Sequence, residues 1–295
     1  MNTRPRGQTG LHVTALGFGV MHLNDGRVSE LDADRLLTQL LGLGVKLIDT
    51  ARGHGLSEER IGRHIAHRRQ EFVLSTKVGY GIEGVPDWTC ACIMAGVDAA
   101  LTRMRCEVLD IVHLHSCPLH TLEQGEVITA LEDCERAGKL RVVAYSGDNV
   151  ELDWAIQSRR FGSVQTSISV CDQVNLANRL PALEHAGLGV IAKRPLAGAV
   201  WRSAMRPETH AEGEYWDRWQ AMALEQALAD TDGNDLALRF TAHLPGVSCS
   251  IVGTAKLAHF EQNLAAVAKG PLPGDQQALM RAAFLRHDRA WAGLI

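Results

Sequence analysis

The sequence predicts an α/β protein, a single (β/α)8 barrel domain over residues 1–295. The length fits this fold, which needs about 250 residues plus insertions. Short apolar segments alternate with amphipathic helical segments along the chain, and eight such pairs favour a parallel sheet closed into a barrel. A doubly wound open sheet is disfavoured because Gly17-Phe-Gly19 lacks the third glycine of a dinucleotide-binding turn. No linker or repeat divides the chain.

Each predicted strand is a short apolar run bounded by glycine, polar or charged residues. The first runs from Val13 to Gly19 and ends in glycines, which indicates a strand that leads into a loop. In chain order, the predicted strands cover residues 13–19, 46–50, 71–77, 108–115, 142–146, 163–169, 189–193 and 250–253.

The predicted helices carry an apolar face at helical spacing, clearest in the leucines of residues 30–44. Ser57 is the expected N-cap of the second helix, because acidic residues follow it in the first turn. A long helical stretch covers residues 214–243, with an interruption at 232–235. The remaining predicted helices cover residues 91–104, 127–138, 151–159, 178–187, 257–268 and 275–290.

The composition is that of an ordinary globular protein, with 46% hydrophobic and 22% charged residues. A net charge of -4 gives no reason to expect nucleic acid or an anionic membrane as partner. No run approaches the roughly 18 apolar residues of a membrane span, and no signal peptide is recognisable. The seven scattered cysteines without a C-x-x-C pattern favour reduced thiols and a cytoplasmic location. Nothing in the sequence indicates an oligomeric state.

Three ionisable residues stand at the ends of consecutive predicted strands: Asp49, Lys77 and His115. In (β/α)8 barrels the active site is built at the carboxyl ends of the strands, so these side chains should meet at one mouth. Asp49 can pair with Lys77 and keep it charged in a partly buried site. A fixed ammonium and a neutral imidazole donor together would polarise a carbonyl oxygen.

The same residues carry a family resemblance. The run Asp49-Thr-Ala-Arg-Gly-His-Gly-Leu-Ser-Glu58 resembles the aldo-keto reductase motif Asp-Thr-Ala-x-x-Tyr-Gly-x-Ser-Glu. Further similar segments follow in the family's order: Ser75-Thr-Lys-Val-Gly79, Asp110-Ile-Val-His-Leu-His115, Val190-Ile-Ala-Lys-Arg-Pro-Leu-Ala197, and Ser250-Ile-Val-Gly-Thr-Ala-Lys256 with Gln262-Asn263. The resemblance covers residues from about 10 to 270.

This resemblance implies a (β/α)8 fold, a nicotinamide cofactor, and a catalytic tetrad of Asp, Tyr, Lys and His. Asp49, Lys77 and His115 match the tetrad, but His54 occupies the position of the tyrosine that donates a proton to the carbonyl oxygen. Beside Lys77, His54 should be mostly neutral, and it can serve as a hydrogen-bond donor or as a base. Two alternatives remain: Tyr80 supplies the donor, or reduction is lost.

The resemblance also implies which residues bind the cofactor. Ser146 and Gln165 match residues that hold the carboxamide, although Gly147 replaces the usual asparagine. Lys193 replaces a tyrosine that stacks on the nicotinamide, and its aliphatic stem could cover part of the ring. The expected pyrophosphate and adenosine contacts are Leu196, Gly198, Gly253, Thr254, His259, Gln262 and Asn263. Lys256 is the nearby cation for a 2′-phosphate, so we expect a slight preference for NADP(H) over NAD(H).

Two functions remain open. The first is an NAD(P)(H)-dependent oxidoreductase that acts on a small-molecule carbonyl or alcohol. The second is a barrel that performs isomerisation or elimination, or that only binds a ligand. His113 and His115 lie on one strand face and could form a metal site with Asp49 or His54, but the charge of Lys77 would repel a metal, so no metal is expected.

Overall fold

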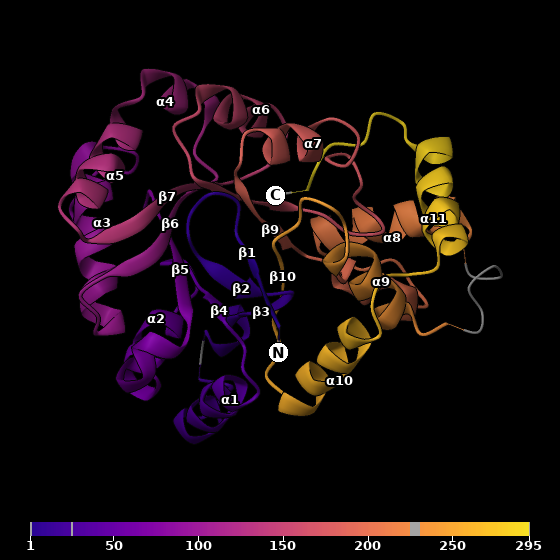
Figure 1. Cartoon of the computed structure of the whole chain (residues 1–295), viewed down its shortest axis with the longest axis horizontal. Helices are drawn as coiled ribbons and strands as arrows, with labels where there is room; N and C mark the ends of the chain where they lie inside the picture. Colours follow the sequence, from indigo (N-terminus) through magenta and orange to yellow (C-terminus); the bar gives the residue numbers. More distant parts are fainter. Residues whose placement is uncertain (1, 25, 225–230, 295) are drawn as a thin grey trace.

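The computed structural model describes residues 2–24, 26–224 and 231–294. Eight parallel strands form a closed barrel in the order β10-β3-β4-β5-β6-β7-β8-β9, and helices surround it (Figure 1). The predicted (β/α)8 fold is therefore confirmed. The barrel strands are β3 (Leu16–Gly19), β4 (Leu47–Asp49), β5 (Val73–Val78), β6 (Leu109–His115), β7 (Leu140–Ser146), β8 (Ser163–Ser167), β9 (Gly189–Lys193) and β10 (Cys249–Val252).

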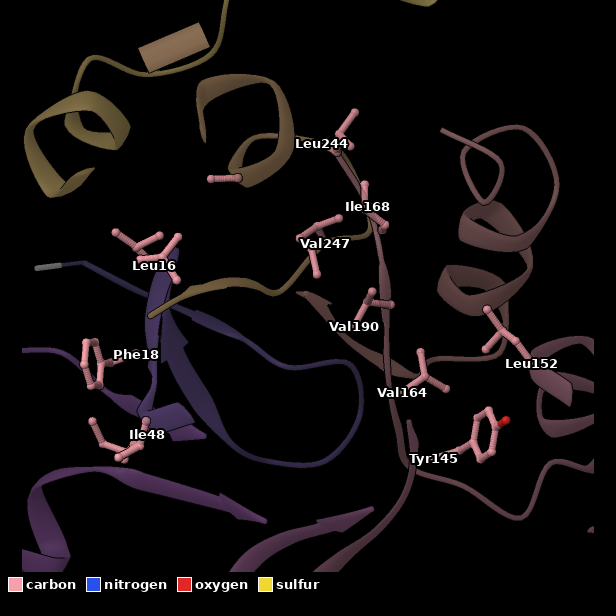
Figure 2. Close-up of a cluster of buried hydrophobic side chains, with 14 of the residues drawn as sticks. Leu16, Phe18, Ile48, Tyr145, Leu152, Val164, Ile168, Val190, Leu244 and Val247 are labelled. Atoms are coloured by element: carbon pink, nitrogen blue, oxygen red, sulfur yellow. The ribbon is translucent and has the colours of Figure 1, made fainter. Parts of the chain in front are cut away.

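Side chains of the strands alternate between the inside of the barrel and the helical layer, as the pleat requires. In β5, Val73 belongs to the small cluster inside the barrel, whereas Leu74 and Val78 pack outward against helices. The outward side chains of neighbouring strands form the main core, and Figure 2 shows part of it, including Phe18 and Val164. The inside therefore remains available for polar residues toward the carboxyl ends of the strands.

A hairpin of β1 (Thr3–Pro5) and β2 (His12–Thr14) packs at the other end of the barrel. Its Leu11 and Val13 join the cluster inside the barrel with the first inward residues of several strands. The prediction of one strand over residues 13–19 was therefore wrong: β2 ends at Thr14, and β3 begins at Leu16. The break arises because Val13 pairs with Arg4 in the hairpin, whereas Gly17 pairs with β10.

The predicted helices are present, with shifted boundaries. They are α1 (Glu30–Gly42), α2 (Ser57–His64), α3 (Cys90–Met104), α4 (Leu119–Gln124), α5 (Glu126–Arg136), α6 (Asn149–Ser158), α7 (Arg179–His185), α8 (His210–Met222), α9 (Gly233–Ala242), α10 (Leu257–Ala268) and α11 (Gly274–His287). Short 3-10 turns occur at Val20–Leu23 (η1), Ala66–Glu71 (η2) and Ala197–Arg202 (η3). The sequence did not predict α4 or the hairpin.

Two further expectations about helices need correction. Ser57 is not an N-cap: Leu56 holds that position, and the Ser57 hydroxyl instead donates to the backbone carbonyl of His54. The stretch 214–243 is not one interrupted helix, because α8 ends at Met222, α9 begins at Gly233, and residues 225–230 lie outside the described residues. In the described ranges, no helix combines the length and apolar character needed to cross a membrane.

Candidate active site

The carboxyl ends of β4, β5 and β6 bring together the three residues that the strand pattern singled out. Asp49 ends β4 and pairs in register with Ser75 of β5. Lys77 pairs in register with His113, two residues before His115 at the end of β6. Because every second residue faces inward, Asp49, Lys77 and His115 all point into the same mouth.

Asp49 and Lys77 form a buried ion pair. The Lys77 Nζ lies 2.7 Å from Asp49 Oδ2 and donates a second bond of 2.7 Å to the Thr50 carbonyl, while the two side chains are only 3% and 4% exposed. Ser75 Oγ donates to the other carboxylate oxygen at 2.7 Å. Burial raises the pKa of Asp49, but the charge of Lys77 and hydrogen bonds from Lys77 and Ser75 hold the pKa below its ordinary value. Burial lowers the pKa of Lys77, and the Asp49 carboxylate opposes this lowering. The carboxylate therefore remains charged and fixes Lys77 Nζ in place.

His113 lies below this pair, inside the barrel. Its Nε2 is 3.2 Å from Ser75 Oγ and its Nδ1 is 3.2 Å from the Tyr145 carbonyl oxygen. Burial and then the charge of Lys77 lower its pKa to about 3, so the ring is neutral. Both ring nitrogens have protein partners, and within the described residues no group of three His, Cys, Asp or Glu side chains could hold a metal.

His54 lies in the loop after β4, at the position where the sequence resemblance leads us to expect a tyrosine. Its ring packs edge-on to the His115 ring, with 6.3 Å between centroids. Its Nδ1 is buried and has no hydrogen-bond partner among the described residues. Burial and then Lys77 lower the pKa of His54 to about 4, so the imidazole is neutral near pH 7. A buried polar atom without a partner is uncommon, and at this mouth it suits contact with a bound molecule.

Tyr80 reaches the same site from the loop after β5. Its hydroxyl lies 2.7 Å from His115 Nδ1, and the two rings stack with centroids 5.4 Å apart. Burial, followed by the charge of Lys77, lowers the pKa of His115 to about 3. The alternative donor suggested by the sequence thus contacts His115. The contact depends on the path of residues 79–88, which no motif reveals.

Ser146 and Gln165, which end β7 and occupy the middle of β8, form the expected pair for a carboxamide. Ser146 Oγ donates to Gln165 Oε1 at 3.2 Å, while Gln165 Nε2 is buried and no residue in the described part of the chain is its partner. This free donor fits an amide oxygen of a nicotinamide. A Cβ atom at Gly147 would lie 2.2 Å from the Tyr145 hydroxyl oxygen. The usual asparagine is therefore incompatible with the position of Tyr145.

Lys193, at the end of β9, is held by an acid that the sequence did not single out. Its Nζ lies 3.0 Å from Oδ2 of Asp148, a fully buried residue after β7. Burial raises the pKa of Asp148, but Lys193 and hydrogen bonds from Thr166 and Ser167 hold it below its ordinary value. The aliphatic stem of Lys193 remains at the mouth, whereas its ammonium is directed to Asp148.

The segment 291–294 is tied to the β7–β9 side of the mouth, and Figure 1 marks this end of the chain near the strands. Its backbone exchanges hydrogen bonds with four side chains: Asn149, Ser167, Asp172 and Arg218. Asp172 is fully buried, and burial together with Asp148 raises its pKa to about 7. These hydrogen bonds join residues that lie 74 or more positions apart in the chain and hold the segment 291–294 against this side of the mouth.

The expected adenosine residues separate into two groups. Gln262 and Asn263 line a cleft of about 360 Å³ with seven other residues, among them the cations Arg202 and Lys269 and the acids Asp232 and Asp235. Gly253, Thr254 and His259 do not line this cleft; Thr254 Oγ1 lies 3.5 Å from His259 Nδ1 at an exposed turn.

The residues expected at the pyrophosphate lie in and before η3. Leu196 precedes this turn, and Gly198 lies within it at a φ of +67°. Arg202 ends η3 and lines the cleft, whereas Lys256, the cation expected from the sequence, does not. Arg202 lies 60 residues before Gln262 in the chain, so the sequence alone did not connect them.

Comparison with known proteins agrees with this geometry. A family model described as the aldo/keto reductase family matches residues 15–284. The L-galactose dehydrogenase of Arabidopsis thaliana is 30% identical over 292 residues, which cover 94% of this chain and 91% of that protein. The L-glyceraldehyde 3-phosphate reductase of Escherichia coli K12 is 30% identical over 217 residues, which cover 67% of this chain and 62% of that protein. Among solved structures, the holo form of aldo-keto reductase AKR11C1 from Bacillus halodurans has a TM-score of 0.83 at 25% identity, over 96% of both chains. The chain therefore belongs to the aldo/keto reductase family.

Proposed function

We propose that this protein is an NAD(P)(H)-dependent oxidoreductase that interconverts a carbonyl and an alcohol of a small molecule at the barrel mouth. The observation that carries the proposal is the buried Asp49–Lys77 ion pair, which lies among the neutral imidazoles of His54 and His115. A fixed cation and neutral donors stabilise negative charge that develops on a carbonyl oxygen. The family membership supports the same class of reaction.

Each residue of the site has a distinct role in this proposal. Asp49 holds Lys77 charged, and Lys77 provides the positive field at the substrate oxygen. His115 donates a hydrogen bond to that oxygen and orients it. His54, in place of the family's tyrosine, uses a ring nitrogen to donate to a carbonyl oxygen or to accept from an alcohol hydroxyl.

The cofactor would bind along the β7–β10 side of the mouth. When bound, a nicotinamide supplies or accepts the hydride. Ser146 and the free Nε2 of Gln165 would hold the carboxamide, and the stem of Lys193 would cover part of the ring. Leu196 and Gly198 would lie at the pyrophosphate, with Gly253, Thr254, His259, Gln262 and Asn263 toward the adenosine.

The expected preference for NADP(H) over NAD(H) remains slight. Arg202 and Lys269 could attract a 2′-phosphate. The carboxylates of Asp232 and Asp235 line the same cleft and would repel a 2′-phosphate. They also offset the two cations, since Asp235 pairs with Lys269 at 2.7 Å and Asp232 lies 3.7 Å from Arg202. We place the protein in the cytoplasm, because seven free cysteines suit a reducing compartment.

A second candidate is a barrel of this family that abstracts a proton without net reduction. The neutral state of His54 is the observation behind it: the ring has a lone pair that can accept a proton, although a pKa of about 4 makes it a weak base. Isomerisation or elimination would then replace reduction, and Lys77 would stabilise an enolate-like oxygen.

A cofactor titration is the first test. Purified protein is titrated with NADPH and with NADH while cofactor fluorescence is followed, and carbonyls and alcohols are then screened for turnover. The names of the relatives place L-galactose and L-glyceraldehyde 3-phosphate first in that screen. We expect micromolar binding, weakened in Gln165→Leu but unchanged in Asp98→Asn on the outer helix α3. Absence of binding to either nucleotide would refute the oxidoreductase proposal.

A further inference from the structure

The Tyr80–His115 contact assigns a role to a residue outside the tetrad. We propose that Tyr80 is a positioning residue: its hydroxyl donates to His115 Nδ1 and thereby keeps the proton of the neutral imidazole on Nε2. This inference rests on the proposed function in one respect: that His115 Nε2 donates to a substrate oxygen. The state of the imidazole itself is a property of the free protein.

The geometry of the pair supports a strong hydrogen bond. The separation of 2.7 Å between the Tyr80 hydroxyl oxygen and His115 Nδ1 is at the short end of the range for such bonds. The two rings are stacked with an interplanar angle of 23°, and Trp88 packs edge-on against Tyr80 with 6.1 Å between centroids. The phenol is therefore held between a tryptophan and the histidine rather than left free in solvent.

The direction that we assign to the hydrogen bond follows from where the single phenol proton can go. A neutral imidazole has one N–H donor and one acceptor nitrogen, and a phenol has one O–H donor and can also accept. His115 Nδ1 is the acceptor that the described residues offer to the Tyr80 hydroxyl. If Nδ1 carried the proton instead, the phenol proton would lose this acceptor. Donation by Tyr80 places the imidazole proton on Nε2, the nitrogen that remains available to a substrate oxygen.

Tyr80 itself is poorly placed to act as the proton donor that His54 replaces. Burial and then the negative charge of Asp87 raise its pKa, and within the described ranges no cation offsets the rise. A phenol that gives its proton to a carbonyl oxygen is instead assisted by a nearby positive charge, which lowers its pKa. Tyr80 is consequently suited to orienting His115.

The loop after β4 leaves space for the Tyr80 ring, because Gly53 has no side chain there. A Cβ atom at Gly53 would lie 3.3 Å from the Tyr80 hydroxyl oxygen and 3.7 Å from Cε2. Any larger residue beside His54 would press on the phenol. Gly53 and Tyr80, from the loops after β4 and β5, therefore fit each other at the mouth, next to the edge-on pair of His54 and His115.

Nitrogen-15 NMR of the imidazoles at pH 7 tests the proposal without any assay of turnover. Uniformly labelled protein and Tyr80→Phe are compared, and His115→Gln identifies the His115 signals by their loss. We expect the Nε2-protonated form in the natural protein and a mixture of tautomers in Tyr80→Phe. Trp88→Phe is the matched control, because it changes the packing but keeps the hydroxyl, and it should retain the natural tautomer.

Kinetics give the second readout. For a substrate found by the screen, Tyr80→Phe should lower kcat by about 10-fold, the scale for the loss of one hydrogen bond, with little change in cofactor Kd. An unchanged His115 tautomer in Tyr80→Phe, or the Nδ1-protonated form in the natural protein, would overturn the inference while the oxidoreductase proposal stands. Conversely, failure to bind any nicotinamide nucleotide would refute the proposed function and leave the tautomer result intact.

Discussion

The two sides of the barrel mouth are organised differently. On the β4–β6 side, Asp49, Lys77 and His115 meet through the register of adjacent strands, and the charged pair is only 28 residues apart in the chain. On the β7–β9 side, Lys193 is paired with Asp148, and the segment 291–294 is bound by side chains as much as 144 residues away. Both sides fix a lysine with a buried aspartate.

The two lysine–aspartate ion pairs differ in their surroundings. Lys77 belongs to the residues that we propose contact the substrate oxygen, and nearby polar atoms such as His54 Nδ1 lack partners. Asp148 instead accepts bonds from Thr166, Ser167 and Lys193, so this carboxylate is satisfied within the protein. We therefore expect changes on the first side to affect chemistry most, and changes on the second side to affect stability most.

Lys77→Met should have the largest effect, because it removes the fixed positive charge from the site. Turnover of any carbonyl should fall by about 10³-fold or more, the scale for loss of electrostatic or proton-transfer groups. The measurement is kcat/KM together with a thermal melt, since the substitution also leaves the carboxylate of Asp49 unpaired. His54→Tyr is the contrasting variant and should preserve or raise carbonyl reduction. If neither change alters turnover, the proposed site is wrong.

Asp148→Asn should have the next largest effect, on folding stability. The variant leaves the Lys193 ammonium without its buried partner, which costs about 3–5 kcal/mol when a buried pair is broken. Urea unfolding followed by circular dichroism measures the change. The double variant Asp148→Asn with Lys193→Met should recover much of the loss, because it removes the unpaired charge as well. Equal stability of the single and double variants would show that the unpaired Lys193 ammonium is not the source of the loss.

Asp172→Asn should have the smallest effect, visible in the pH dependence of stability. The folded-state pKa of Asp172 is about 7, raised from 3.8, so the folded protein binds a proton that the unfolded chain releases. Its contribution is fully present below about pH 4 and is lost as the pH rises to about 7. The variant should lack this loss, so its free energy of unfolding should rise relative to that of the natural protein as the pH increases from 4 to 8.

Urea unfolding of both proteins between pH 4 and pH 8 tests this expectation. Asp98→Asn, which changes an exposed carboxylate on α3, should keep the natural slope. Parallel slopes for Asp172→Asn and the natural protein would show that Asp172 does not titrate in this range.

The sequence by itself determined the barrel and the β4–β6 side of the site. Alternation of apolar strands with amphipathic helices specifies a parallel closed sheet, and inward side chains at strand ends must share one mouth. Asp49, Lys77 and His115 were therefore predictable as neighbours. The neutral state of His54 was also predictable, because a lysine nearby disfavours an imidazolium.

Only the tertiary structure decided the contacts that depend on the paths of loops. The Tyr80 hydroxyl reaches His115 from the loop 79–88, which closes on itself where Trp88 N–H donates to the Gly79 carbonyl. Asp148 reaches Lys193 across the ends of two strands. Arg202, at the end of η3, lines the same cleft as Gln262. The segment 291–294 forms hydrogen bonds with Ser167 of β8 and Asn149 of α6. Strand pairing has a fixed period that a sequence displays, whereas loop conformations are set by packing among residues distant in the chain, which leave no local pattern.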